Sequence, residues 1–205
     1  MGRDKNHHHA MDDIINVKKD EHKLMGEIIG ESFADDPVNK WVFNNSHALI
    51  RYNILAAKKL YLKKGFAHRT HAGIGGTLWL PPKTKKYIPL WNSVDIAYEM
   101  IKGDGFRALR RGMLADDAMA VAKPSIPHYY LYAIGVRPGH QGQGIGSRLL
   151  KEGLRVVDHA HMPAYLESSK KANVPLYERY GFEVKKVLKP GNDCPPLWLM
   201  WRRAR

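Results

Sequence analysis

The stretch Tyr129–Leu150 reads YYLYAIGVRPGHQGQGIGSRLL, and it decides how the rest of the chain is interpreted. It begins with an apolar run rich in Tyr, Ile and Val, which is typical of a buried strand. The run stops at Arg137-Pro138, and a glycine-rich loop leads into a helical pattern near Ser147. A strand, a glycine loop and a helix in this order present backbone N–H groups to phosphates.

Two common phosphate-binding patterns fail in this loop. A P-loop needs a lysine after its last glycine, and Ile145 occupies that position. The dinucleotide fingerprint G-x-G-x-x-G starts with Gly142 and Gly144, but Ser147 stands where the third glycine is needed. Only residues 168–205 follow the next predicted strand, which is too short for the second half of a doubly wound sheet.

The spacing of apolar residues predicts strands that alternate with helices along one α/β domain, residues 11–205. The expected strands are 14–17, the end of 66–80, 164–167, 182–187 and 197–201, and the expected helices are 22–33, 37–43, 46–64, several within 90–122, and 174–180. Residues 1–10 (MGRDKNHHHA) look like the remnant of an expression tag, with Met11 as the natural start.

Composition narrows the class of protein. The chain has 205 residues, a formal net charge of +13 and one cysteine, Cys194, so it forms no internal disulfide. No apolar run is long enough to span a membrane, and no leader pattern opens the chain. We therefore expect a cytoplasmic protein without a membrane partner. The positive charge fits either a solvated basic surface or an anionic ligand.

A third glycine pattern is satisfied, Gln/Arg-x-x-Gly-x-Gly/Ala, by Gln141–Gly146. The strand Leu131–Val136 precedes it, and Asn173-x-x-x-Tyr177-x-x-x-Gly181-Phe182 follows about 25 residues later. With these neighbours the chain resembles the GNAT superfamily of N-acetyltransferases. Further segments resemble the subgroup that includes puromycin N-acetyltransferase, namely Phe33–Pro37, Trp79–Pro82, Ala164–Ser169 and Leu197–Trp201.

The resemblance implies a mixed, mostly antiparallel sheet of about six to seven strands. Helices cover both faces, and two strands splay apart at a cleft for acetyl-CoA. It also implies that the loop grips the pyrophosphate and that the strand before it pairs with the pantetheine amides. The implied cofactor-binding residues are Ile134, Gly135, Val136, Gln141, Gly142, Gln143, Gly144, Ile145, Gly146, Ser147, Asn173 and Tyr177.

Further roles are expected around this loop. Gln141 would brace it, while Arg137, His140 and Arg148 could add positive charge. Gly135, an unusual strand residue, suits a bulge or a close approach. Asn173 is expected to contact the cofactor or to cap the helix that follows it.

Two catalytic residues are predicted. By resemblance, Tyr177 is the general acid that protonates the departing sulfur, and Tyr180 is the better candidate for the core tyrosine of that helix. Glu167 is expected to be the general base, with Tyr130 and Tyr132 sharing one face of the neighbouring strand. No metal site is expected.

The sequence therefore favours an acetyl-CoA-dependent N-acetyltransferase that acts on a primary amine of a small molecule, as a monomer or homodimer. A protein or peptide N-acetyltransferase is one alternative. A basic nucleic-acid-binding protein is another, although no finger, heptad or aromatic RNP-like strand is present and no nucleic-acid partner is expected. Residues 83–125 match the family least, so substrate contacts are expected there.

Overall fold

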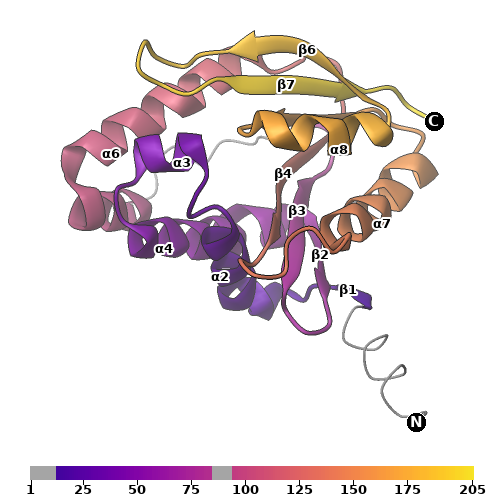
Figure 1. The fold of residues 1–205 in the computed structure, drawn as a ribbon, viewed down its shortest axis with the longest axis horizontal. Coiled ribbons are helices and arrows are strands. Elements are labelled where there is room, and N and C mark those ends of the chain that lie inside the picture. The colour runs from indigo at the N-terminus through magenta and orange to yellow at the C-terminus, as the bar shows by residue number, and fades with distance from the viewer. Residues whose placement is uncertain (1–12, 85–93) are drawn as a thin grey trace.

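The computed structural model describes residues 13–84 and 94–205, so the tag-like segment and the expected helical residues 90–93 lie outside it. Its centre is a seven-stranded sheet of order β1-β2-β3-β4-β5-β7-β6 (Figure 1). The strands are β1 (Ile14–Asn16), β2 (Phe66–Thr70), β3 (Gly75–Leu80), β4 (Tyr129–Val136), β5 (Ala164–Ser168), β6 (Phe182–Leu188) and β7 (Leu197–Arg202).

The helices connect these strands in the order that the sequence predicts. They are α2 (His22–Ser32), α3 (Pro37–Val42), α4 (Ser46–Ala56), α5 (Leu62–Lys64), α6 (Val94–Ala122), α7 (Ile145–His159) and α8 (Val174–Arg179). Short 3-10 turns η1 (Lys19–Glu21) and η4 (Lys171–Asn173) precede α2 and α8, and the π-helical turn η2 (Ala57–Tyr61) joins α4 to α5. None of the helices among the described residues is long and apolar enough to cross a membrane.

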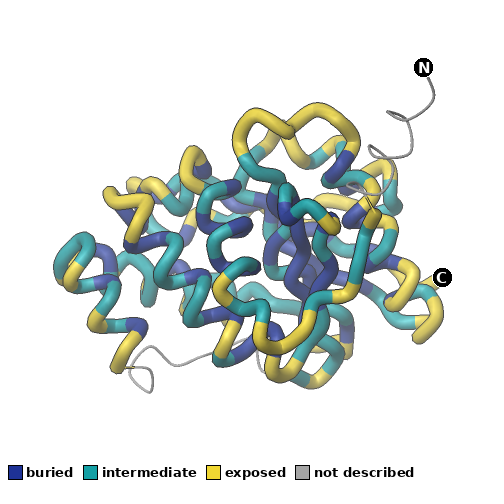
Figure 2. The backbone as a smooth tube through the Cα atoms, turned by 90° about the horizontal axis from the view of Figure 1, so that it is seen from below, coloured by how far each residue is buried: buried dark blue, intermediate teal, exposed yellow. Residues whose placement is uncertain are grey.

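Helices pack on both faces of the sheet, as two neighbouring glycines of β3 show. A Cβ on Gly75 would meet Leu149 of α7, while a Cβ on Gly76 would meet Met25 of α2. Successive strand residues point to opposite faces, so α7 and α2 cover opposite sides. Figure 2 shows the buried stretches gathered in the middle of the molecule, with exposed backbone around them.

All strand pairs are antiparallel except β4 and β5, which run parallel over three residue pairs, from Tyr129↔Ala164 to Leu131↔Leu166. Beyond Leu131, β4 pairs only with β3, and β5 pairs only with β7. The register between β3 and β4 shifts at this point, because Leu78 pairs with Ala133 whereas Trp79 pairs with Leu131, which makes Tyr132 the extra residue of a bulge. The predicted mixed sheet and its splay are therefore present.

Two local predictions need correction. The segment 66–80 forms a hairpin of two strands, where the sequence indicated one strand at its end. In the segment 90–122, Gly103 and Gly112 do not interrupt the helix, and the single kink in α6 lies at Gly105, whose φ is 73°. Gly103 instead packs closely on Ala48 of α4, which explains the glycine without a break.

Candidate active site

The loop between β4 and α7 is built from glycines in left-handed backbone conformations. Gly139, Gly142 and Gly144 have φ values of 83°, 78° and 77°. A Cβ added to any of them would meet nothing within 4 Å. These glycines are therefore required by the backbone path and leave the space beside the loop open to a ligand.

The N-terminus of α7 carries unpaired donors at this loop. Gly144 is its N-cap residue and supplies no side-chain cap, whereas Asp36 and Asn45 cap α3 and α4. The first helical bond that the loop accepts is from the Arg148 N–H to the Gly144 carbonyl, at 3.1 Å. The preceding N–H groups of α7 have no partner within the helix, so a 15-residue helix dipole and free donors meet at one point.

Three contacts fix the loop. The Gln141 side chain donates to the Val136 carbonyl over 3.2 Å, which is the bracing role predicted for it. Arg137 forms an ion pair with Glu31 of α2 over 2.9 Å, so the carboxylate of Glu31 balances its positive charge within the fold. The Ser147 and Tyr180 hydroxyls lie 2.7 Å apart, which ties the start of α7 to the end of α8.

The predicted arm-binding segment, Ile134–Val136, lies on β4 where β5 has turned away, and it pairs only with β3. Gly135 does not form the bulge. A Cβ there would lie 2.6 Å from the Cβ of Ser32 and 2.8 Å from its Oγ, so Gly135 allows α2 to approach the sheet. The close approach expected at this glycine is therefore to α2.

Tyr177 lies on α8 and is 6% exposed, packed edge-on to Phe182 with ring centroids 6.1 Å apart. Tyr180 is less buried, which is contrary to the expectation that it would be the core tyrosine of this helix. Burial, and then the negative charge of Asp36, raise the pKa of Tyr177 above its ordinary value. Its hydroxyl therefore stays protonated at neutral pH. Asn173 stands at the N-cap of α8 but makes no capping hydrogen bond.

Glu167 lies on β5 just past the last pair with β4. It accepts a hydrogen bond from the Tyr130 hydroxyl over 2.7 Å, which holds its carboxylate against β4. Burial, and then the charge of Glu167, raise the pKa of Tyr130, so this tyrosine remains a hydrogen-bond donor. His128 lies at the start of β4, and its ring packs against the rings of Tyr165 and Trp201.

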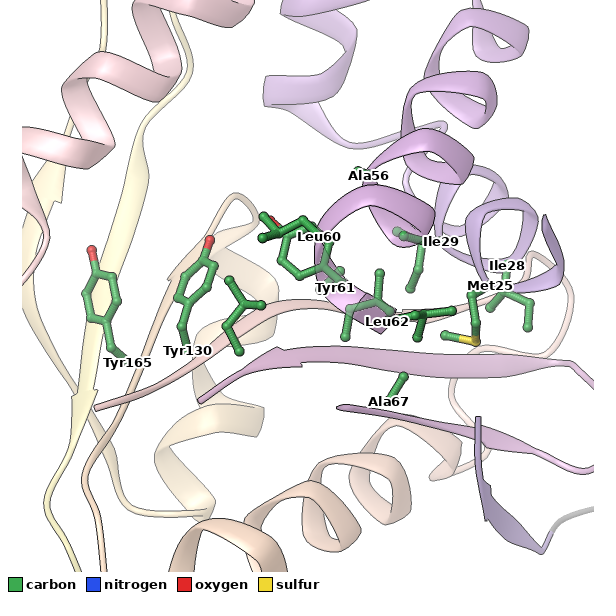
Figure 3. Close-up of a cluster of buried hydrophobic side chains, with 14 of the residues drawn as sticks. Met25, Ile28, Ile29, Ala56, Leu60, Tyr61, Leu62, Ala67, Tyr130 and Tyr165 are labelled. Atoms are coloured by element: carbon green, nitrogen blue, oxygen red, sulfur yellow. The ribbon is translucent and has the colours of Figure 1, made fainter. Parts of the chain in front are cut away.

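A cavity of about 330 Å³, which we call the acceptor cavity, opens beside Glu167. Strand residues Tyr130, Tyr132 and Glu167 line one side of it, and residues of α3, α4 and α6 line the others. Figure 3 shows Tyr130 on the sheet beside Tyr61 and Leu60, with Ile29 of α2 on the side of them away from Tyr130. The helix α6 lies within residues 83–125, where the sequence placed substrate contacts without naming residues.

Four tyrosines, which we call the tyrosine wall, line this cavity: Tyr52, Tyr61, Tyr130 and Tyr132. The rings of Tyr61 and Tyr132 stack at a centroid distance of 4.0 Å. Burial is the largest cause that raises the pKa of each of the four, and Asp116 or Glu167 adds to it. The wall therefore presents neutral rings and hydroxyls to the cavity at physiological pH.

The corner between α2 and α3 closes the cavity near β5. Asp36 is 1% exposed, caps α3 through the Asn39 N–H at 2.9 Å, and accepts a hydrogen bond from the Ser169 hydroxyl. Beside it, Asp35 forms an ion pair with Lys170 at 2.7 Å. No local pattern in the sequence predicts that these two segments meet, because more than 130 residues separate them.

Comparisons with known proteins agree with this geometry. Residues 106–184, which include β4, the glycine loop, α7, β5 and α8, match the model of the acetyltransferase (GNAT) domain. An uncharacterized N-acetyltransferase of Schizosaccharomyces pombe is 27% identical over 91% of this chain and 81% of its own length.

Solved structures share the whole fold. A histone acetyltransferase and related acetyltransferase from Corynebacterium glutamicum superimposes with a TM-score of 0.70 at 23% identity, covering 94% of this chain and 96% of that one. Arylalkylamine N-acetyltransferase 2 from Aedes aegypti gives a TM-score of 0.63 at 14% identity, covering 94% and 99%.

The fold is thus the GNAT fold, a seven-stranded, open, mixed sheet with helices on both faces. The domain match over the glycine loop and the N-acetyltransferase relative support acetyltransferase activity for the chain.

Proposed function

We propose that this protein is an acetyl-CoA-dependent N-acetyltransferase that transfers the acetyl group to the primary amine of a small molecule by direct attack. The observation that carries the proposal is the arrangement of three features at one place. An uncapped helix N-terminus, a strand that no longer pairs with its neighbour and a cavity lined by a carboxylate all meet at the splay between β4 and β5.

The residues present suit acetyl-CoA. The loop Gln141–Gly146 and the N-terminus of α7 offer open space and free N–H groups, as a pyrophosphate requires. The released edge of β4 at Ile134–Val136 offers backbone groups to the amides of the pantetheine arm, as in the addition of a strand. Asn173, Gln143 and Ser147 complete the proposed set.

The chemistry then needs one base and one acid. Acetyl-CoA supplies an acyl thioester when it is bound. Glu167 faces the acceptor cavity and accepts a proton from the ammonium group, which leaves a neutral amine. With acetyl-CoA bound, Tyr177 would give its phenol proton to the departing sulfur, and the second proton of the attacking nitrogen would then restore the phenol. The raised pKa of Tyr177 favours the return of that proton.

A small molecule is favoured as the acceptor over a peptide because the cavity has a volume of about 330 Å³ and many of its lining residues belong to the core. The corner Phe33–Pro37, one of the segments that resemble the puromycin N-acetyltransferase subgroup, supports the same view. It places buried Asp36 against Ser169 and so encloses the cavity near β5. The proposal therefore includes membership of the subgroup that resembles puromycin N-acetyltransferase.

The test has two parts. Acetyl-CoA should raise the unfolding temperature, and a concentration 100 times its Kd stabilises the fold by about 2.7 kcal/mol. Release of free thiol should then require an added primary amine. A protein whose melting temperature does not respond to millimolar acetyl-CoA would contradict the proposal.

The role of Tyr177 is tested separately. Tyr177→Phe should lower kcat by about 10²-fold or more while the acetyl-CoA thermal shift stays unchanged. Tyr129→Phe, at the paired start of β4, is the matched control and should retain activity. Equal turnover in Tyr177→Phe and wild type would remove this tyrosine from the mechanism.

A further inference from the structure

We infer that the acceptor is a primary amine on an extended, uncharged apolar tail, and that α6 sets the length of tail that fits. This inference rests on the proposed function and concerns the acceptor cavity alone. The cavity is polar where Tyr130 and Glu167 lie and where Asp116 of α6 acts on the tyrosine wall, and residues of α3 and α6 supply its main apolar lining. An amine placed beside Glu167 therefore directs the rest of its molecule toward α3 and α6.

The apolar side is one continuous surface. Five of the residues that line the cavity, Val42, Phe43, Ile96, Met100 and Ala115, belong to one buried cluster formed by α3, α4 and α6. All five are less than 9% exposed. A polar or charged tail would lose its hydration there without gaining partners, whereas an apolar tail gains from burial.

The helix α6 contacts the cavity with residues at helical spacing, two of them small. Gly112, Ala115 and Met119 follow one another at intervals of three and four, so they share one face of the helix. A Cβ on Gly112 would lie 2.8 Å from the Met100 Cε, which shows that Met100 reaches this glycine across the kink at Gly105. The Met100 side chain therefore forms the end of the apolar part of the cavity beside Gly112. The small side chain of Ala115 leaves space in the cavity next to Met100.

The charged residues of the cavity favour a particular kind of head group on the acceptor. Three acidic residues line the cavity, Asp36, Asp116 and Glu167, together with one lysine, Lys123. Burial, and then the charge of Asp116, raise the pKa of Tyr132, and the charge of Glu167 adds to it. A cationic head is favoured in this field, and an acceptor with its own carboxylate, such as an amino acid, is disfavoured.

Size limits the tail. At about 30 Å³ for each water molecule, a volume of about 330 Å³ corresponds to roughly eleven waters. This is enough for a short chain or a ring system, and it lies at the lower end of cavities that bind small ligands. The rate should therefore rise with tail length and then fall once the tail meets Met100.

The experiment measures kcat/KM for a series of straight-chain primary alkylamines with saturating acetyl-CoA. In the wild-type protein each added methylene should raise kcat/KM by roughly tenfold until an optimum is reached. Met100→Ala should move the optimum to amines longer by about two or three carbons, because it removes three side-chain heavy atoms. Ala115→Val should move it to shorter amines.

Matched controls separate the cavity from the general effect of altering the core. Met25 is fully buried like Met100 but does not line the cavity, so Met25→Ala should lower stability without moving the optimum. Ala108 is buried on α6 in the same cluster and also does not line it, so Ala108→Val is the control for Ala115→Val.

The outcomes are distinct. Opposite shifts in the two cavity variants, with unmoved controls, support the inference. An optimum that is the same in both cavity variants overturns it, as do faster rates with peptides, diamines or amino acids than with alkylamines. If acetyl-CoA stabilises the fold but no amine releases thiol, the proposed function itself fails, independently of the tail.

Discussion

Close packing of α2 on β4 at Gly135 leads to a specific prediction about stability. The change is Gly135→Ala, which adds one methyl group. That carbon would lie 2.6 Å from the Ser32 Cβ and 2.8 Å from its Oγ, both far inside van der Waals contact. Because Ser32 is 8% exposed and its Oγ bonds the Ile28 carbonyl at 2.6 Å, it has no room to withdraw.

The magnitude follows from known effects of overpacking. One methyl group forced into a packed core costs about 1–3 kcal/mol. Removing the opposing group by Ser32→Gly costs about 1 kcal/mol on its own, as glycine does within a helix. The double variant should then be destabilised by about the cost of Ser32→Gly alone, so the size of the coupling free energy should equal the cost of Gly135→Ala, about 1–3 kcal/mol.

Urea unfolding of the four proteins measures this coupling from the midpoints at equal m values. Gly146→Ala is the matched control, since its Cβ would meet only the Val136 Cγ2, at 3.9 Å, and should leave stability equal or slightly raised. Additive single effects, within about 0.5 kcal/mol, would refute steric contact between Gly135 and Ser32 as the reason for the glycine.

Three further predictions concern the loop, an ion pair and pH. Gly144→Ala, at φ 77°, should cost about 1 kcal/mol of stability and reduce the acetyl-CoA thermal shift; an unchanged shift would remove the loop from the proposed binding site. Arg202→Met should destabilise the protein by about 3 kcal/mol in urea unfolding, because Arg202 is 2% exposed and donates two hydrogen bonds, of 2.6 and 2.9 Å, to Asp158. Arg155→Met removes one partner of an exposed ion pair and should cost under about 1 kcal/mol. Similar losses of stability in the two variants would contradict this reasoning. The tyrosine wall should make the fold sensitive to alkali, because the pKa values of its tyrosines in the folded state are raised above the unfolded value of about 10. The contribution of these tyrosines to stability is fully present below about pH 10 and is lost as the pH rises further. Thermal melts across that pH range would measure this loss.

Local sequence patterns predicted most of the fold. The glycine loop, the strand before it and the helix after it were recognisable because each depends on neighbouring residues. The bracing role of Gln141 could be expected for the same reason, since its partner, Val136, is five residues away. Strand boundaries from Ala164 onward also agree with the structure to within one or two residues.

What the sequence could not show depends on contacts between distant segments. The bond between Asp36 and Ser169 joins residues 133 positions apart, and no periodicity predicts it. The acceptor cavity is formed in the same way, by α2, α3, α4, α6 and the strands together. Gly135 was correctly recognised as an unusual strand residue. The reason for this glycine is its contact with Ser32, which lies on another element, α2.

Burial of the two tyrosines near α8 was predicted in the wrong order. Tyr180 was expected to be the core tyrosine, but its hydroxyl bonds Ser147 at the start of α7, and Tyr177 is the residue that packs inside. The short length of α8, six residues, explains the error, because one turn and a half has no clear apolar face.

The order of the strands has a consequence for synthesis of the chain. β7, the last of the seven strands along the described chain, is not at the edge of the sheet but between β5 and β6. Until Leu197–Arg202 emerge, β5 holds only three pairs with β4, and β6 has no partner strand. A nascent or truncated chain would therefore display two open strand edges, which are the surfaces most prone to pair with other molecules.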